Sequence, residues 1–214
     1  VAIDPAITCG TCRACRDGYR NLCYRIRFSG HGDTDGMMRQ VMAWPSSLLH
    51  PLPDSVSDAG GALLEPLGVA LWSLDLGHLP FAGTAAVVGC GPIGLLLIQL
   101  LRAAGASRVV AVEPLEHRRE AAARCRADLV LQPGEPVSGL GVDVAFDAVG
   151  GDVTLQPFRC MGFNGRHLIA GFSEGIELED AAYLTPRPFA YGNFSLCGVC
   201  LVYVDDPLGV RRTL

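Results

Sequence analysis

Four cysteines lie close together near the start of the sequence, in the pattern C-x2-C-x2-C-x7-C. Four thiolates this near to one another can surround one tetrahedral zinc ion, with each sulfur at about 2.3 Å from the metal. A closed set of four protein ligands leaves no coordination position for a substrate, so we expect a structural metal site. Its predicted ligands are Cys9, Cys12, Cys15 and Cys23.

Three other interpretations of this cysteine cluster remain open. An iron–sulfur cluster also uses four cysteines, and spacing alone does not separate it from zinc. A disulfide knot fits less well, because the chain has nine cysteines, an odd number, and its first residues lack a secretion-signal pattern. Free thiols are the third interpretation. Arg13, Arg16 and Arg20 lie among the cysteines, and their positive charge should favour the thiolate forms that a metal requires.

A second group that can do chemistry is the pattern G-x-G-x-x-G, formed by Gly89, Gly91 and Gly94. It follows a short apolar run that predicts a strand over 85–88 and precedes a long apolar run that predicts a helix through 95–104. Gly89 should permit a sharp turn, and Gly91 should let the backbone approach a pyrophosphate. Gly94 should let the helix pack close to the strand.

The first turn of this predicted helix contains Pro92 and Ile93, and its free amides and helix dipole should favour a bound phosphate. The next predicted strand, over 108–112, ends at Glu113, where a carboxylate can accept hydrogen bonds from the adenosine ribose. An ordinary glycine-rich turn without a ligand is the alternative. Because the strand, helix, second strand and acid occur in this order, we predict a dinucleotide site.

The sequence around Glu113 also bears on which dinucleotide binds. Arg118, in a helix predicted over 116–125, could lie against the adenine ring or accept a 2′-phosphate. The Glu113 carboxylate should repel a 2′-phosphate more strongly than a solvated arginine attracts it, so we expect NAD rather than NADP. Later strand ends should complete the site at Val149 and Gly171, because ligands bind at the carboxyl ends of parallel strands.

Composition and periodicity indicate an α/β protein. Half of the 214 residues are hydrophobic and 26 are glycine, while the net charge of −5 disfavours nucleic acid and acidic membranes as partners. No apolar run reaches membrane-spanning length, and we expect a cytoplasmic protein. Further strands are predicted over 128–131, 142–146, 167–171 and 194–204, with a helix over 153–161. Six strands with intervening helices predict a Rossmann-type, doubly wound parallel sheet.

Glu65 stands next to Pro66, between two apolar runs that each predict a helical piece. Pro66 disfavours helical geometry at the residue before it and suits the start of a second helix running to about residue 76. The carboxylate should therefore lie at a helix break. A charge in apolar surroundings needs a partner, although an exposed capping glutamate fits these residues equally well.

The four-cysteine lobe, the EPLG stretch at 65–68 and the glycine pattern, in that order, resemble the zinc-dependent medium-chain dehydrogenases, the alcohol and polyol dehydrogenase family. The resemblance covers nearly the whole chain. It implies part of a GroES-like β domain over 1–79, followed by a Rossmann domain over 80–214. It also implies hydride transfer between a secondary alcohol or polyol and NAD, with Glu65 taking part in a catalytic zinc site directly or through water.

The remaining catalytic-zinc ligands of that family, a cysteine and a His-Glu pair, have no match in residues 1–7. We therefore expect a fragment of a longer protein that turns over little by itself. Two alternatives remain: an NADPH-dependent quinone or enoyl reductase of the same superfamily, and a nucleotide-binding module without catalysis. The edge strand over 194–204 could pair two copies of the chain. Within it, Cys197 and Cys200 imitate a redox C-x-x-C, but we expect two structural cysteines.

Overall fold

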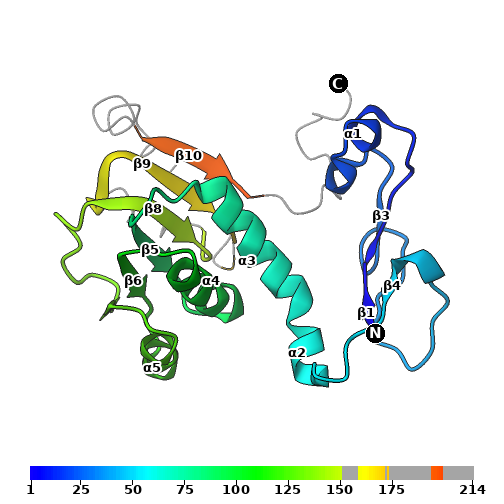
Figure 1. The fold of residues 1–214 in the computed structure, drawn as a ribbon, viewed down its shortest axis with the longest axis horizontal. Coiled ribbons are helices and arrows are strands. Elements are labelled where there is room, and N and C mark those ends of the chain that lie inside the picture. Colours follow the sequence, from blue (N-terminus) through cyan, green and yellow to red (C-terminus); the bar gives the residue numbers. More distant parts are fainter. Residues whose placement is uncertain (151–158, 172, 174–193, 200–214) are drawn as a thin grey trace. The chain divides into compact units, whose positions relative to one another are not determined.

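The computed structural model describes residues 1–150, 159–171, 173 and 194–199 (Figure 1). Contacts divide this part of the chain into two compact units, residues 1–64 and residues 65–199. Each unit is described by itself. The domain boundary expected after residue 79 stays a prediction.

The first unit is built from two short antiparallel strand pairs and the segments between them. Strand β1 (Ala2–Ile3) pairs with β4 (Leu49–His50), and β2 (Ala6–Ile7) pairs with β3 (Arg27–Phe28). The cysteine segment leaves β2 and returns at β3. It contains helix α1 (Arg13–Arg16) and the 3₁₀ turn η1 (Arg20–Leu22), and a second 3₁₀ turn, η2 (Ser46–Leu48), precedes β4.

The predicted helix break is present, but not at Glu65. Helix α2 (Asp58–Ala62) begins at Ser57, whose Oγ accepts a hydrogen bond from the amide of Gly60 at 3.1 Å. Helix α3 (Leu64–Gly77) then includes Glu65 and Pro66 in its first turn, so the break lies at Leu63. Amides in a first turn have no intrahelical acceptor, so the missing N–H of proline costs nothing there. A glutamate in the same turn is favoured by the helix dipole.

The second unit contains a parallel sheet of six strands among the described residues, as the sequence predicted (Figure 1). In chain order they are β5 (Thr84–Val88), β6 (Arg108–Val112), β7 (Leu129–Leu131), β8 (Val142–Asp147), β9 (Met161–Ile169) and β10 (Ser195–Gly198). Their order across the sheet is β10-β9-β8-β5-β6-β7. The chain thus starts in the middle and reverses direction between β5 and β8, which opens a crevice at the carboxyl ends of the strands.

The sheet is covered on one face by α3, α4 (Pro92–Ala103) and α5 (Glu116–Arg124). Val87 and Val109 belong to the core on that face, whereas their neighbours Ala86 and Val110 belong to a second core on the other face. This alternation is the period of two that a strand imposes. None of the described helices combines the length and apolar character that crossing a bilayer requires.

Strand β9 corrects two predictions. It begins at Met161, so the helix expected over 153–161 does not reach that residue; residues 153–158 lie outside the described part. The strand expected over 167–171 is longer and begins earlier. Its first half pairs irregularly with β8, and Asn164 has a positive φ of 64°. The sequence FNGR resembles a turn, and therefore periodicity missed the strand.

The edge position of the last described strand was predicted correctly. Strand β10 pairs in parallel with β9 and is the last strand on its side of the sheet that the described residues form. The rest of the predicted strand, 200–204, lies outside the described residues, and so does Cys200.

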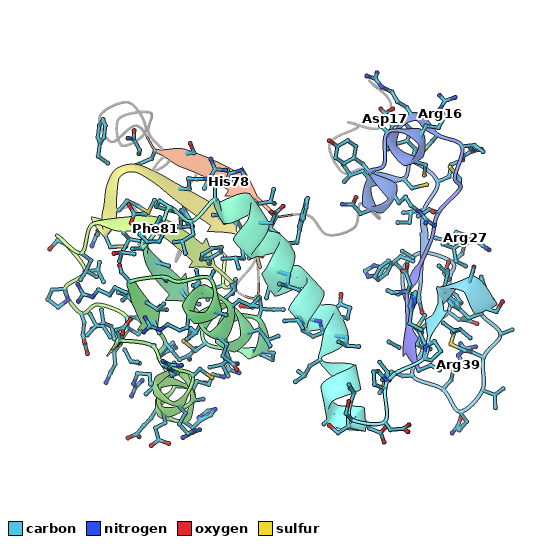
Figure 2. The ribbon with its side chains drawn as sticks, viewed as in Figure 1. Arg16, Asp17, Arg27, Arg39, His78 and Phe81 are labelled. Atoms are coloured by element: carbon cyan, nitrogen blue, oxygen red, sulfur yellow. The ribbon has the colours of Figure 1, made fainter. Side chains whose placement is uncertain are left out.

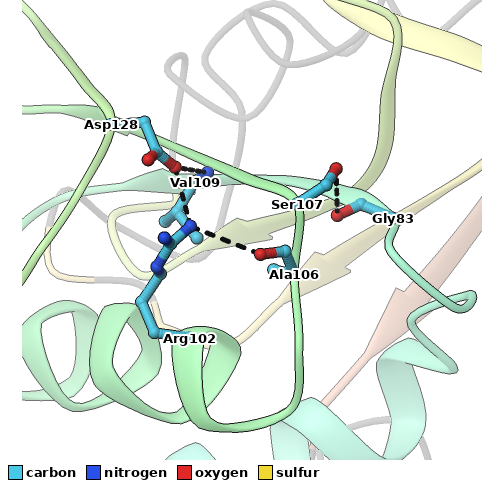
Figure 3. A network of polar contacts seen from close by, with 6 residues as sticks. All are labelled: Gly83, Arg102, Ala106, Ser107, Val109 and Asp128. Atoms are coloured by element: carbon cyan, nitrogen blue, oxygen red, sulfur yellow. Dashed lines mark hydrogen bonds and ion pairs between the residues drawn. The ribbon is translucent and has the colours of Figure 1, made fainter.

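A polar network fastens α4 to the starts of β6 and β7 (Figure 3). Asp128 Oδ2 accepts hydrogen bonds from the Val109 amide at 2.6 Å and from Arg102 Nη1 at 2.9 Å. Arg102 Nη1 also donates to the Ala106 carbonyl at 3.3 Å. The Asp128 carboxylate therefore accepts a hydrogen bond from a strand amide and orients Arg102, which lies in the last turn of α4.

We expect Asp128→Ala to lower the free energy of unfolding by about 2 kcal/mol, because a strand amide and a guanidinium lose their common acceptor. Urea unfolding followed by circular dichroism measures this. The matched control is Glu120→Ala, which removes an exposed ion pair with Arg124 at 3.8 Å and should cost less than about 0.5 kcal/mol. Equal losses in the two variants would contradict the role given to Asp128.

Candidate functional site

The four predicted metal ligands come together in the first unit. The Sγ atoms of Cys9, Cys12, Cys15 and Cys23 all lie within 4.8 Å of one another. Four sulfurs around one zinc ion at 2.3 Å would be about 3.8 Å apart, and the pair Cys12–Cys23 is already at 4.0 Å. A multi-iron cluster would hold the sulfurs farther apart than one ion does. The donor set therefore fits a single zinc ion.

Backbone amides point at these sulfurs. The amide of Cys12 donates to Cys9 Sγ at 3.3 Å, and the amides of Cys9 and Arg25 donate to Cys23 Sγ at 3.3 and 3.4 Å. Hydrogen bonds from the amides of Thr11 and then Cys12 lower the pKa of the Cys9 thiol to about 5. Amide donors of this kind stabilise the charged form of the sulfur, which is the form that binds metal.

Cys15 differs from Cys9, because burial raises the pKa of its thiol to about 12. The surroundings of the cluster therefore shift the pKa values of these two thiols in opposite directions. Zinc must displace the proton of Cys15 when it binds, so the lobe should bind zinc more tightly as the pH rises.

One arginine that interacts with the sulfurs is not among those that the sequence indicated. A side-chain hydrogen bond with Cys9 raises the pKa of Arg25. Arg13 instead pairs with Asp17 at 3.5 Å, and Arg20 Nη2 donates to Thr8 Oγ1 at 3.2 Å. The side chains of Arg16 and Asp17 are exposed at the end of α1 (Figure 2). All four cysteines of this cluster are free thiols, so no disulfide joins them.

The three glycines of the G-x-G-x-x-G turn in the second unit differ in their surroundings. Gly89 has a φ of +85°, which few other residues adopt. A Cβ on Gly94 would lie 1.9 Å from the Gly89 carbonyl oxygen, so only glycine lets α4 pack here. A Cβ on Gly91 would meet no protein atom within 4 Å. The backbone at Gly91 therefore faces open space.

That open space is a cleft of about 380 Å³ at the carboxyl ends of β5, β6 and β8. Eight of the nine predicted cofactor residues line it: Gly89, Gly91, Pro92, Ile93, Gly94, Glu113, Arg118 and Val149. Gly171 does not line it. A Cβ on Gly171 would lie 2.5 Å from the Ala148 carbonyl oxygen, so this glycine permits close backbone packing. Pro133 and Ser173 also line the cleft, and no motif in the sequence indicated them.

Glu113 is 2% exposed, although it lines the cleft. Its Oε2 accepts a hydrogen bond from the Cys90 amide at 2.7 Å, and its Oε1 accepts one from the Leu115 amide at 3.0 Å. These bonds compensate the burial of the charge and fasten the glycine turn to the end of β6. Each carboxylate oxygen has two lone pairs, so both can accept a further bond from a ribose hydroxyl.

The surroundings of two residues near Glu113, Cys90 and Arg119, decide what their side chains can do. Burial, and then the charge of Glu113, raises the pKa of the Cys90 thiol to about 12, so this cysteine is a poor nucleophile at neutral pH. Arg119 Nη1 donates to the carbonyls of Glu113 and Pro114. Arg118 is therefore the arginine of this pair that lines the cleft.

Glu65 is exposed in the first turn of α3. Among the described residues, the four cysteines form the one group of three or more possible metal ligands, and Glu65 is not part of it. The structure thus brings together the predicted structural metal ligands and most of the cofactor residues, but it places Glu65 in no group of three or more possible ligands within the described chain.

Comparison with known families assigns both units. Residues 1–54 match the family described as alcohol dehydrogenase GroES-like domain, and residues 92–208 match the family described as zinc-binding dehydrogenase. The second match alone covers more than half of the chain.

Individual proteins agree with this. The chain is 34% identical over 169 residues to a protein named probable D-xylulose reductase A from Aspergillus terreus, covering 73% of this chain and 48% of the relative. It is also 34% identical to L-idonate 5-dehydrogenase from Vitis vinifera, covering 73% and 46%. The chain therefore spans about half the length of these curated relatives. A solved zinc-binding dehydrogenase from Sinorhizobium meliloti bound to NADP superposes with a TM-score of 0.82 at 28% identity, covering 99% of this chain and 63% of the other.

Proposed function

Because this chain belongs to the zinc-dependent medium-chain dehydrogenases, we propose that it is the structural-zinc and cofactor-binding part of an NAD-dependent oxidoreductase acting on a secondary alcohol or polyol. The observation that carries the proposal is the glycine turn. Gly89 and Gly94 are packed against protein, while the backbone of Gly91 faces an open cleft at the crossover of a parallel sheet. Such a turn is built for a ligand that approaches the main chain.

The residues of the cleft would hold the cofactor in a defined direction. The first turn of α4, with Pro92 and Ile93, would bind the pyrophosphate through free amides and the helix dipole. Glu113 would accept hydrogen bonds from the adenosine ribose, and Arg118 would lie against the adenine. The nicotinamide half would extend toward Val149 on the other side of β5. Bound NAD would supply the acceptor for a hydride from the carbinol carbon.

The metal assignments differ in their support. The four cysteines would hold a structural zinc ion, and their close thiol donors fit it. Glu65 remains the candidate for a catalytic zinc site, but it belongs to no group of three or more possible ligands among the described residues. We therefore assign no reaction step to it, and we expect the 214 residues alone to turn over little alcohol.

Location and assembly are also proposals. Free thiols at the four cysteines of the cluster favour a reducing compartment, and we propose the cytoplasm. The substrate would be a small molecule, with neither nucleic acid nor a membrane as partner. The edge of β10 that does not face β9 could pair with a second copy of the chain around a two-fold axis.

A second candidate is an NADPH-dependent quinone or enoyl reductase of the same superfamily. Two observations favour it: Arg118 lines the cleft where a 2′-phosphate would lie, and the solved relative from Sinorhizobium meliloti is bound to NADP. The buried Glu113 carboxylate, which also lines the cleft, argues against this candidate, because its charge would repel the 2′-phosphate of NADPH.

Calorimetric titration of the chain with NAD and with NADP tests the proposal. We expect NAD to bind at least about tenfold more tightly, since Glu113 disfavours a second negative group. Arg118→Leu should weaken NADP further and change the affinity for NAD by less than about threefold. Tighter binding of NADP by the unmodified chain would favour the reductase. Absence of binding by both nucleotides would reject the function proposed for the cleft.

A further inference from the structure

Asp147, the last residue of β8, organises the turn that forms one wall of the cleft. Its Oδ1 accepts hydrogen bonds from the amides of Val149 at 2.9 Å and Gly150 at 3.0 Å. The amide of Ala148 donates to the Val88 carbonyl at 3.0 Å. The turn is therefore held at three consecutive amides, two by one carboxylate and one by the neighbouring strand.

The other oxygen of this carboxylate faces a buried histidine. Asp147 Oδ2 lies 3.7 Å from His167 Nε2 on β9, and both side chains are 0% exposed. A carboxylate removed from water in this way costs several kcal/mol unless donors compensate it, and the two turn amides are such donors to Oδ1. With Oδ2 directed at β9, Oδ1 is left directed at the turn.

The position of this turn decides where Val149 lies. A Cβ on Gly89 would come within 2.6 Å of Val149 Cγ2, so the valine fills the space that the glycine leaves. Val149 also lines the cleft, together with Ala148. A small movement of the turn would either drive Val149 against the glycine turn or withdraw it from the cleft wall.

We propose that Asp147 is a positioning residue for cofactor binding, acting through the amides of the turn that it holds. The inference rests on the proposed function and adds a specific half of the cofactor. Glu113 and Arg118 follow β6, whereas the Asp147 turn follows β8, on the opposite side of β5. The adenosine ribose binds at the acid after the second strand, so the Asp147 turn contacts the nicotinamide-bearing half.

The test compares NAD with AMP, which lacks that half. We expect Asp147→Ala to weaken NAD by about tenfold or more and AMP by less than about twofold, measured by calorimetry on the full chain. Asp147→Asn retains an oxygen acceptor for the two amides and should restore NAD binding to within about threefold of the unmodified chain. Such a rescue is not expected if only the charge of Asp147 matters.

Asp143→Ala is the matched control on the same strand. Asp143 Oδ2 accepts from the Thr84 amide at 2.7 Å, at the end of β8 away from the cleft. We expect this variant to lose thermal stability while both nucleotides bind as before. If Asp147→Ala does not fold, Asp147→Ser carries the test, because its hydroxyl is a weaker acceptor and should give an intermediate loss for NAD alone.

Two results would overturn the inference: NAD affinity unchanged in the Ala and Ser variants, or an equal loss for NAD and AMP. Failure of the unmodified chain to bind AMP and NAD would instead overturn the function of the cleft. The two failures are therefore distinguishable.

Discussion

Loss of zinc is expected to unfold the cysteine lobe, residues 9–23, and to leave the Rossmann unit folded. Within this segment Ala14 and Cys23 are the buried hydrophobic residues, and its regular structure is α1 and one 3₁₀ turn. So small a core cannot offset the conformational entropy of the ordered chain. Structural zinc contributes about 10 kcal/mol or more in comparable small sites, so the metal should supply nearly all of the stability of the lobe.

The expected result is one zinc ion per chain by atomic emission, and its loss in Cys15→Ser. Trypsin provides a structural measurement, because Arg13, Arg16 and Arg20 lie inside the lobe. Cleavage at these arginines depends on how often the lobe opens, and removing zinc by a chelator or by Cys15→Ser should accelerate it at least about a hundredfold.

Cys125→Ser is the matched control, since Cys125 is a free thiol outside the cluster. It should retain zinc and resist trypsin like the unmodified chain. A Cys15→Ser variant that keeps a full equivalent of zinc, or a chelated lobe that still resists trypsin, would show that the four cysteines are not a zinc site.

Sequence spacing was sufficient to predict this cluster because its four ligands lie within one short segment. The groups that tune the sulfurs were not predictable in the same way. Arg25 lies two residues beyond the last ligand, and it interacts with the first ligand, Cys9, only because the segment folds back. The amides that donate to sulfur carry no sequence signal, since every residue except proline has one.

In the sheet, too, features that depend on local sequence were predictable, whereas features that depend on distant segments were not. Continuous apolar runs predicted β5 and β6 to within one residue, because strands buried on both faces need such runs. Strand β9 was predicted short, since its first half contains Gly162 and Gly165 and pairs irregularly. At the cleft, the spacing of the three glycines was sufficient to predict that they lie at its wall. The two amide bonds to Glu113 were not predictable in this way, because they depend on where two separate loops meet.

Gly94→Ala should lower the free energy of unfolding and abolish the binding of NAD. The new methyl group would lie 1.9 Å from the Gly89 carbonyl oxygen, well inside van der Waals contact. That oxygen belongs to the main chain, and the amide of Gly89 is held by the Val112 carbonyl at 2.9 Å. The contact cannot be relieved by rotating a side chain, so the helix must move away from the sheet. We expect a loss of about 3 kcal/mol or more in the free energy of unfolding.

Gly91→Ala separates binding from folding at the same turn. Gly91 has a φ of −72°, which alanine adopts easily, and its Cβ would meet no protein atom within 4 Å. The free energy of unfolding of the variant should therefore lie within about 1 kcal/mol of that of the unmodified chain. Its methyl group would occupy the part of the cleft where the pyrophosphate approaches the backbone, so NAD should bind at least about a hundredfold more weakly.

Gly68→Ala completes the comparison as a glycine substitution inside a helix and outside the cleft. A Cβ at Gly68 meets nothing within 4 Å in α3, so alanine should stabilise the chain by about 0.5–1 kcal/mol and leave NAD affinity unchanged. Urea unfolding and calorimetric titration of the three variants give the decisive pattern. If Gly91→Ala bound NAD as tightly as the unmodified chain, no cofactor could approach the backbone at this turn, and the nucleotide site would have to lie elsewhere.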